Sequence, residues 1–432
     1  WNLQNIKKME RFTMEKTKFS FLGVIMTIGI IFGDIGTSVL YVMKSFIKTS
    51  GDNMNELLVL GFVSLIFWIM TLQTTIKYVL IALKADNKGE GGVFSLYALI
   101  KNNTKKFVVF LAMVGGATLL ADGVITPAIT VTSAIEGLHN IFPNLSTNGV
   151  VLIVLGIFIF IFSFQHLGTK KIGGLFGPIM TLWFLSLLLW GVRAITTNLT
   201  ILKAINPYYA LSLIRSYPGI FLLLGAVFLC VSGAEDLYVD LGHCGRKNIK
   251  AAWTFVKICL LTNYFGQAAY LLSENYNPTK NPFFAIVPEN LVIIQVLLAT
   301  LAAIIASQSL ITGSFTLVSE AIKLNLFPKL VIKYPTDIRG QVYVSAVNII
   351  LFIFSSSVVV FFRTSSNMEA AYGLSISITM FVTTILLSLY LYKIKNQKRG
   401  KKQKKKKKKK SKNYGVNIFY CFWIRRKFIF IC

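Results

Sequence analysis

Ten stretches of about 20 apolar residues recur along the chain, and they constrain its fold more than any other feature. Each stretch is long enough to cross a hydrocarbon core of roughly 30 Å. Apolar residues fill 54% of the 432 positions, and the mean hydropathy is +0.64. We therefore expect an all-α polytopic membrane protein. The expected spans are 19–42, 57–83, 107–137, 149–165, 174–195, 217–241, 251–272, 290–312, 342–362 and 369–392.

The basic residues indicate an orientation in the membrane and not a nucleic-acid partner. The net charge is +28, but residues 393–432 alone hold 17 of the 45 Lys and Arg. With the N-terminus in the cytoplasm, the inner segments before residue 393 carry 19 basic residues and the outer loops 7. This asymmetry follows the positive-inside rule. We expect a multi-pass protein of the cell membrane with both termini cytoplasmic and the lipid bilayer as its partner.

Two of the expected spans are interrupted by glycines and an acid. The first run contains FGDIGTSVLY around Asp34, and the sixth contains CVSGAEDLYVD around Glu235. Polar breaks at matching positions of two halves are typical of inverted-repeat transporters, whose site lies at the midplane. We therefore expect a LeuT-like 5+5 inverted repeat, with repeats at 19–195 and 217–392 and with helices 1 and 6 broken. The alternative is that the second break only ends a helix near the membrane surface.

The acids within the runs are accompanied by hydroxyl groups. Carboxylates at membrane depth are costly and commonly functional. Asp122, Thr126 and Thr130 share one helix face, and Ser232 lies three residues before Glu235. Carboxylates and hydroxyls together suit a hard cation, and proton-coupled carriers use the same acids. We see no nucleophile–base pair, metal-ligand cluster or CxxC pair among the five cysteines, so we expect neither an enzyme nor a cofactor.

Eight motifs along residues 19–392 resemble those of the KUP/HAK/KT potassium transporters, members of the amino acid–polyamine–cation superfamily. The motifs are GDIGTSVLY, KADNKGEGG, ADGVITPAI with SAIEGL, SGAEDLYVDLGHCGR, NYFGQAAYL, NPFF, LATLAAIIASQSLITGSF and SNMEAAYG. The resemblance implies K+ uptake with protons. It places the K+-binding acids at Asp34, Asp122 and Glu235. We expect Glu235 to carry the coupled proton, because it closes the second broken helix, with Asp122 as the next candidate. Its candidate oxygen ligands are Tyr41, Thr126, Thr130, Ser232 and Tyr372.

Other functions stay open beside K+/H+ symport. An amino-acid carrier, or a carrier of another cation, would share the superfamily fold, but acids at the breaks disfavour an anionic substrate group. A passive channel is disfavoured because the chain has no TVGYG-type filter. The oligomeric state is not decided by the sequence, and a homodimer remains open.

Three segments follow from this reading. Residues 1–18 form a cytoplasmic N-terminal segment, and 19–392 form the ten-span transport domain. Residues 393–432 include KRGKKQKKKKKKKSK, and we expect this polybasic tail to be out of frame or non-native. A tail that contacts anionic lipid is the alternative.

Overall fold

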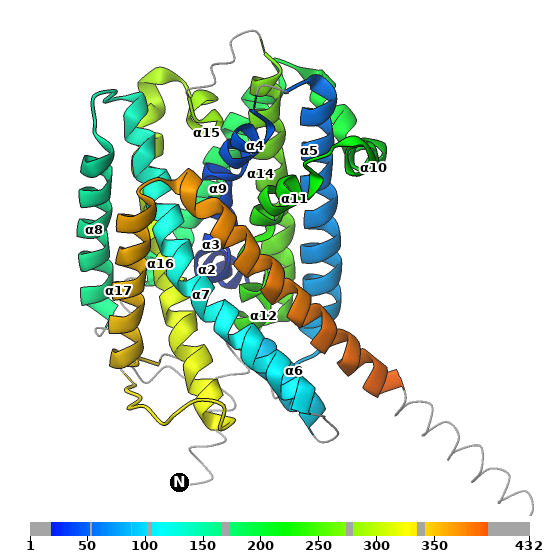
Figure 1. The fold of residues 1–432 in the computed structure, drawn as a ribbon, viewed down its shortest axis with the longest axis vertical. Helices are drawn as coiled ribbons and strands as arrows, with labels where there is room; N and C mark the ends of the chain where they lie inside the picture. The colour runs from blue at the N-terminus through cyan, green and yellow to red at the C-terminus, as the bar shows by residue number, and fades with distance from the viewer. Residues whose placement is uncertain are drawn as a thin grey trace, which may run out of the picture.

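The computed structural model describes residues 19–51, 54–87, 89–101, 106–165, 173–273, 280–334 and 342–395. Within these residues the chain is a bundle of helices, with two isolated β-bridges, Asn87–Glu90 and Lys333–Tyr343, and no strand (Figure 1). Residues 1–18 and most of the expected tail lie outside the described part. The all-helical membrane architecture expected from the apolar runs is confirmed.

The first expected span is broken where the sequence predicts. Its two parts, Phe21–Ile31 and Gly33–Ser50, meet at an angle of 70°. Gly33 permits the close approach of a neighbouring helix, since a Cβ at this position would lie 2.8 Å from the Ala306 Cα. The span also ends later than predicted, at Ser50 instead of residue 42. Its elements are α2 (Phe21–Ile31), α3 (Gly33–Thr37), η1 (Ser38–Leu40) and α4 (Val42–Ser50).

The remaining helices of the first half follow the expected runs. The second span changes from an α-helix to a wider π-helical segment at Met70. The third expected run forms one helix of 31 residues with Pro127 inside it, which crosses the bundle obliquely (cyan in Figure 1). The elements are α5 (Glu56–Ile69), η3 (Met70–Ile81), η4 (Ala82–Lys84), α6 (Val93–Ile100), α7 (Lys106–Glu136), η6 (Gly137–Asn140), α8 (Thr147–Phe164), α9 (Gly173–Ile195) and η8 (Leu199–Ile205).

The second half contains the other predicted break, between η9 and α12. Its last helix, Ser365–Lys395, runs obliquely beside α7 (orange in Figure 1). The elements before it are α10 (Pro207–Ser216), α11 (Ile220–Phe228), η9 (Leu229–Val231), α12 (Asp236–Val239), α13 (Leu241–Cys244), α14 (Arg246–Leu271), α15 (Pro282–Ala285), η10 (Glu289–Leu291), α16 (Val292–Lys323) and α17 (Ser345–Phe362).

Length and apolarity alone select fewer helices than the ten predicted spans. In the described residues, eight helices are long and apolar enough to cross a membrane, and nine if the bent first pair counts as one span. The difference lies in the expected span 251–272, which falls within α14. This helix has 26 residues, roughly 39 Å at 1.5 Å per residue. It carries Lys257, Asn263 and Gln267, so its composition is less apolar than that of the others.

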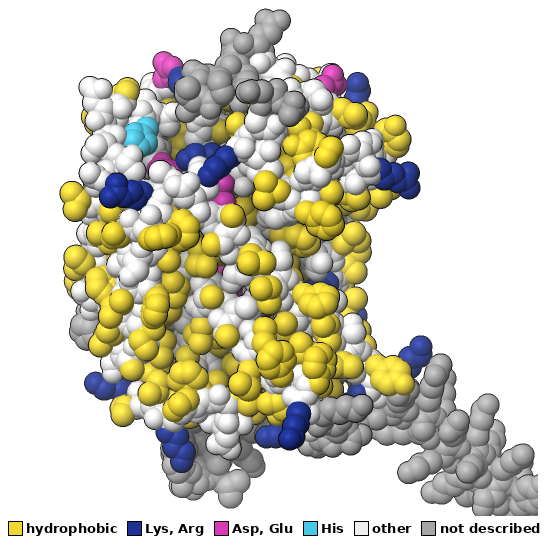
Figure 2. Space-filling model, viewed as in Figure 1, with side chains coloured by type: hydrophobic (Ala, Val, Ile, Leu, Met, Phe, Trp, Pro, Cys, Tyr) yellow, Lys and Arg dark blue, Asp and Glu magenta, His cyan; other side chains and the backbone are white. Residues whose placement is uncertain are grey.

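The surface has the distribution of a membrane protein. Hydrophobic side chains cover the middle of the face in Figure 2, and Lys and Arg gather toward its two ends. Phe21, Phe221 and Phe361 are each at least 80% exposed. The interior is held by packing of α9 against α2 and α14 and of α16 against α7. Aromatic residues with almost no exposure, among them Trp183 and Trp253, fill the space between the helices.

An ion pair ties three elements together at one end of the bundle. Lys44 of α4 donates to the Glu136 carboxylate of α7 at 2.7 Å. The backbone N–H of Ser365, at the start of the last helix, donates to the other oxygen of Glu136 at 2.8 Å. The Ser365 hydroxyl also donates to Glu136. We call Lys44, Glu136 and Ser365 the end clamp. It joins α4, which follows the first break, to two long helices.

Candidate functional site

The two helix breaks meet inside the bundle. Asp34 lies in the first turn of α3 and is 2% exposed. Gly233, in the second break, has a φ of +70°, which favours glycine. A Cβ at Gly233 would lie 2.7 Å from the Asp34 Oδ2. The second break is therefore not simply a helix end at the surface, because its backbone packs directly against the acid of the first break.

A chain of hydroxyls connects Asp34 with Asp122. The Tyr372 hydroxyl of the last helix lies 3.3 Å from Oδ1 and 3.5 Å from Oδ2 of Asp34, and it donates to this carboxylate. It is 2.7 Å from the Thr126 Oγ1, which in turn lies 2.8 Å from the Asp122 Oδ1. Three elements that are distant in sequence, α3, α7 and the last helix, thus converge on one polar network.

Tyr41 and Ser232 complete this group. Their hydroxyls lie 3.4 Å apart, and the Tyr41 ring meets the Tyr372 ring edge-on at 6.2 Å between centroids. Both residues are fully buried. The structure therefore brings six of the eight predicted ligands together. We call these six residues the central cluster: Asp34, Tyr41, Asp122, Thr126, Ser232 and Tyr372.

Thr130 is buried on α7 but is not joined to the central cluster by a hydrogen bond. Its Oγ1 has no hydrogen-bond partner among the described residues. This hydroxyl remains a ligand candidate only by its position two turns beyond Asp122 on the same helix. In the described part of the chain no three His, Cys, Asp or Glu side chains lie close enough to hold a metal ion.

Glu235 has a separate set of partners. It is 7% exposed, and its Oε1 accepts hydrogen bonds from the Tyr78 hydroxyl at 2.6 Å and the Thr383 hydroxyl at 2.8 Å. Its Oε2 is buried and has no hydrogen-bond partner in the described residues. Glu235 thus lies buried at the second break, but its hydrogen bonds lead to η3 and the last helix and not to Asp34.

The sequence reasoning missed a lysine beside Glu235. In the structure, the Lys77 Nζ donates to the Met380 carbonyl at 2.9 Å, to the Tyr78 hydroxyl at 3.2 Å and to the Thr383 hydroxyl at 3.4 Å. Its position within an apolar run was a usable signal, since a charge at that depth is rare without a function. We call Lys77, Tyr78, Glu235 and Thr383 the Glu235 cluster.

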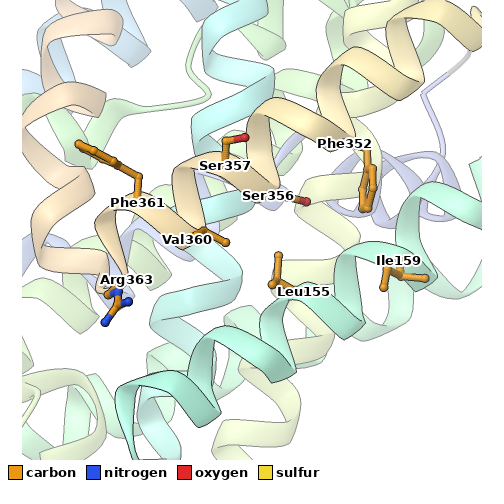
Figure 3. A pocket seen from close by; sticks show the side chains of 8 residues that line it. All are labelled: Leu155, Ile159, Phe352, Ser356, Ser357, Val360, Phe361 and Arg363. Carbon is orange, nitrogen blue, oxygen red and sulfur yellow. The ribbon is translucent and has the colours of Figure 1, made fainter.

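A pocket lies elsewhere in the molecule, between α8 and α17, and it contains none of the predicted site residues (Figure 3). Its lining is mostly apolar, with Arg363 at one end. The lining residues are Leu155, Ile159, Phe352, Ser356, Ser357, Val360, Phe361 and Arg363. The buried acids and hydroxyls, and not this pocket, form the candidate site.

Comparison with known proteins identifies the family. Residues 21–403 match a family model described as the K+ potassium transporter integral membrane domain. A protein of Clostridium perfringens (strain SM101 / Type A), named probable potassium transport system protein Kup, is 54% identical over 387 residues, 86% of this chain and 58% of that protein. A protein of the same name from Enterococcus faecalis is 52% identical over 390 residues, 86% of this chain and 58% of its own length.

A third relative of that name, from Streptococcus equi subsp. equi, is 54% identical over 376 residues, 84% of this chain and 56% of its own length. The chain thus spans less than two thirds of the length of these relatives. Its match to the family model nevertheless covers most of the chain, including both helix breaks. The chain belongs to the KUP/HAK/KT family of potassium transporters, a family of membrane carriers and not of enzymes.

Proposed function

We propose that this protein takes up K+ across the cell membrane by secondary active transport, as a K+/H+ symporter. The observation that carries the proposal is the meeting of Asp34 and Gly233, which joins two broken helices at a buried acid. Broken helices at matching positions favour a LeuT-like 5+5 inverted repeat, with α2–α4 as helix 1 and α11–α12 as helix 6. The names of the relatives, potassium transport system proteins, support the choice of ion.

The K+ ion would bind at the central cluster. Partly dehydrated K+ is held by several oxygen atoms, and the cluster offers two carboxylates and four hydroxyls. We assign the ion first to Asp34 and Asp122, with Thr130 as an additional ligand and Glu235 as the third acid. A carrier for amino acids is less compatible with this geometry, since the substrate carboxylate would face Asp34 and Asp122.

The hydrogen bonds of the central cluster suggest where a proton is carried. The chain from Asp34 to Asp122 has three hydrogen bonds, Asp34–Tyr372, Tyr372–Thr126 and Thr126–Asp122, and each needs one proton. The hydroxyls of Tyr372 and Thr126 supply only two protons. One carboxyl proton would complete the chain, which makes Asp122 a candidate for proton coupling. Glu235 is the other candidate, because its Oε2 is buried without a described partner.

The membrane potential would drive this transport. One K+ and one H+ carry two charges inward, and each charge gains about 2.3 kcal/mol per 100 mV. The gain is therefore about 4.6 kcal/mol at 100 mV. With both termini cytoplasmic, the basic inner segments would face the anionic inner leaflet. We also propose that the protein assembles as a homodimer.

Rubidium uptake by cells that lack their own K+ importers tests the proposal. We expect uptake with the unaltered chain and none with Asp34→Asn at any pH, because a direct ligand is lost. Glu235→Gln should still bind rubidium but should no longer acidify the interior during uptake. Glu289→Gln is the matched control, since this carboxylate is 96% exposed outside the site, and it should behave as the unaltered chain.

Two outcomes would contradict the proposal. Normal uptake by Asp34→Asn would remove the central cluster from ion binding. Normal proton coupling by Glu235→Gln would exclude Glu235 as the proton carrier and leave Asp122 as the residue to test.

A further inference from the structure

Three backbone carbonyls of the first helix break accept hydrogen bonds from side chains of other elements. The segment changes from α3 to the short 3-10 helix η1 and then to α4, so its carbonyls leave the regular α-helical hydrogen-bond pattern. We propose that Trp183, Gln267 and Asn281 are positioning residues for the K+ site. Their N–H groups hold these carbonyls and thereby fix the backbone between Asp34 and Tyr41. The inference rests on the proposed binding of K+ at the central cluster.

Trp183 and Gln267 each hold one carbonyl. The Trp183 indole of α9 donates from Nε1 to the Gly36 carbonyl at 3.0 Å. The Gln267 amide of α14 donates from Nε2 to the Val39 carbonyl, also at 3.0 Å. Because both side chains are fully buried, solvent water is not at hand to replace a lost donor. Removing either N–H group should therefore destabilise the conformation in which the carbonyl is held.

The third carbonyl, that of Leu40, has two donors. The Asn281 Nδ2 lies 2.9 Å from it, and the Ser133 hydroxyl of α7 lies 3.2 Å from it. The other end of the Asn281 side chain caps α15, where its Oδ1 accepts from the Phe283 N–H at 3.0 Å. The Phe283 ring packs in turn on the Trp183 ring, at 5.5 Å between centroids. One amide therefore joins the first break to α15 and to a neighbouring donor.

Two sequence motifs that take no part in the central cluster supply these donors. NYFGQAAYL contains Gln267 and also Tyr264, whose hydroxyl lies 2.9 Å from the Ser38 hydroxyl of the break. The same motif contains Gly266, where α14 meets α9 closely: a Cβ at this position would lie 2.7 Å from the Gly191 oxygen. NPFF begins with the asparagine that caps α15. Both motifs thus contact the first break directly.

The consequence for the ion follows from the position of the held segment. It lies between Asp34 and Tyr41, two members of the central cluster, so a shift of its backbone moves both side chains. A binding site needs its ligands within about 0.5 Å of the productive geometry. Loss of a donor should therefore weaken ion binding through the backbone, although none of the three donors belongs to the central cluster.

Two substitutions remove one donor each. Trp183→Phe keeps an aromatic ring without the N–H group, and Gln267→Met keeps the length of the side chain without the amide. We expect each to raise the rubidium concentration for half-maximal uptake about fivefold or more, because a buried carbonyl loses its donor. The maximal rate per protein in the membrane should stay close to that of the unaltered chain. A residue that only stabilises the fold would lower the amount of protein and leave the half-maximal concentration unchanged.

Trp190 and Gln295 provide matched controls. Trp190 lies on α9, about two turns after Trp183, and its Nε1 donates to the Gln295 Oε1 of α16 at 3.1 Å. Gln295 is buried, and its Nε2 donates to the Ser186 hydroxyl at 3.2 Å. Trp190→Phe and Gln295→Met should therefore leave the half-maximal concentration unchanged. Uptake is measured with the full chain in cells that lack their own K+ importers, after correction for the amount of protein in the membrane.

A double variant keeps the test decisive if the first two variants fold poorly. Asn281→Ser retains a side chain that caps α15, and together with Ser133→Ala it removes both donors from the Leu40 carbonyl. It should also raise the half-maximal concentration. Asn206→Ser is its matched control, because Asn206 likewise caps a helix that begins with proline, α10, and accepts from the Tyr208 N–H at 3.0 Å. We call the double variant and the two single ones the donor variants.

The outcomes separate this inference from the proposed function. If Asp34→Asn abolishes uptake and the donor variants keep the half-maximal concentration of the unaltered chain, the donors do not position the site and the proposed function stands. If Asp34→Asn takes up rubidium normally, the proposed ion site fails, and this inference fails with it. If the donor variants and their controls raise the half-maximal concentration equally, the effect is a general loosening of the packing, and the inference is overturned.

Discussion

Replacing Gly233 by alanine should disrupt the contact between the two broken helices. The substitution adds one methyl group at a position whose φ is +70°. A left-handed conformation costs an L-residue roughly 1–2 kcal/mol. The new Cβ would also lie 2.7 Å from the Asp34 Oδ2 and 2.8 Å from its Cβ, against 3.4 Å or more in ordinary contacts. Either Asp34 or the backbone at Gly233 must therefore move.

The size of the effect follows from these two terms. If the ion-binding conformation is destabilised only by this backbone strain of about 1–2 kcal/mol, the affinity for the ion falls 5- to 30-fold. Displacement of Asp34 adds to this, because the carboxylate leaves the position at which it meets Tyr372. We expect Gly233→Ala to raise the rubidium concentration for half-maximal uptake at least tenfold.

Gly225→Ala is the matched control for this experiment. Gly225 lies in the preceding helix α11, and a Cβ there would meet nothing within 4 Å. Alanine in a helix interior stabilises it by roughly 0.5–1 kcal/mol over glycine. Uptake by this variant should equal that of the unaltered chain. If Gly233→Ala also keeps the original affinity for rubidium when equal amounts of protein are in the membrane, the close contact between Gly233 and Asp34 does not position the ion site.

Three further predictions follow from other contacts. Tyr372→Phe removes the hydroxyl between Asp34 and Thr126 and should weaken the apparent affinity for rubidium by about 1–3 kcal/mol, measured from uptake at several concentrations. Lys44→Met leaves Glu136 without its cation. Because the lysine side chain is 30% exposed, we expect a loss of only about 1–2 kcal/mol, seen as a lower Tm of the purified protein. Membrane-impermeant thiol reagents should label Asn144→Cys from outside and Asn87→Cys only after permeabilisation.

Each of these experiments has a control. Tyr392→Phe alters an exposed tyrosine and should leave rubidium affinity unchanged, so an equal loss in both variants would argue against the hydroxyl bridge. Lys280→Met removes a lysine whose exposed partner lies 3.8 Å away, and it should not change the Tm. The labelling is done in a chain from which Cys421 and Cys432 have been replaced. The reverse labelling pattern would overturn the proposed orientation.

The sequence predicted the breaks and the central acids because both leave a local trace. A glycine–acid interruption inside an apolar run, as at Asp34, is visible without any knowledge of neighbours. The partners of Glu235 leave no such trace. Thr383 is 148 residues from Glu235, and a threonine in an apolar helix commonly bonds its own backbone. The Thr379 carbonyl, also 2.8 Å from this hydroxyl, is the local acceptor that competes with Glu235 for its one proton. Only the fold shows that its hydroxyl also faces an acid.

α14 does not stand out by apolarity, although the sequence predicts the span 251–272 within it. A long helix stands out by apolarity only if most of its sides are apolar. α14 instead carries amides that bond other helices, such as Asn263 to the Leu187 carbonyl and Gln267 to the Val39 carbonyl. The apolarity of a helix thus reflects the part of its surface that contacts lipid. Polar side chains that face the other helices lower this apolarity. The second break shows the same limit, since its contact with Asp34 depends on a backbone angle at Gly233.

The last helix belongs to both clusters at once. It presents Tyr372 to Asp34 and Thr383 to Glu235, eleven residues apart, or roughly 16 Å along the helix axis. Because a helix moves nearly as a rigid rod, a rotation about its axis would withdraw both hydroxyls in the same movement. Ion binding at Asp34 would then change the hydrogen bonds of Glu235, and protonation of Glu235 would change those of Asp34. No direct bond between the two acids is needed, because the helix links them mechanically. A cross-link that fixes this helix against α7 should thus arrest ion exchange and proton exchange together.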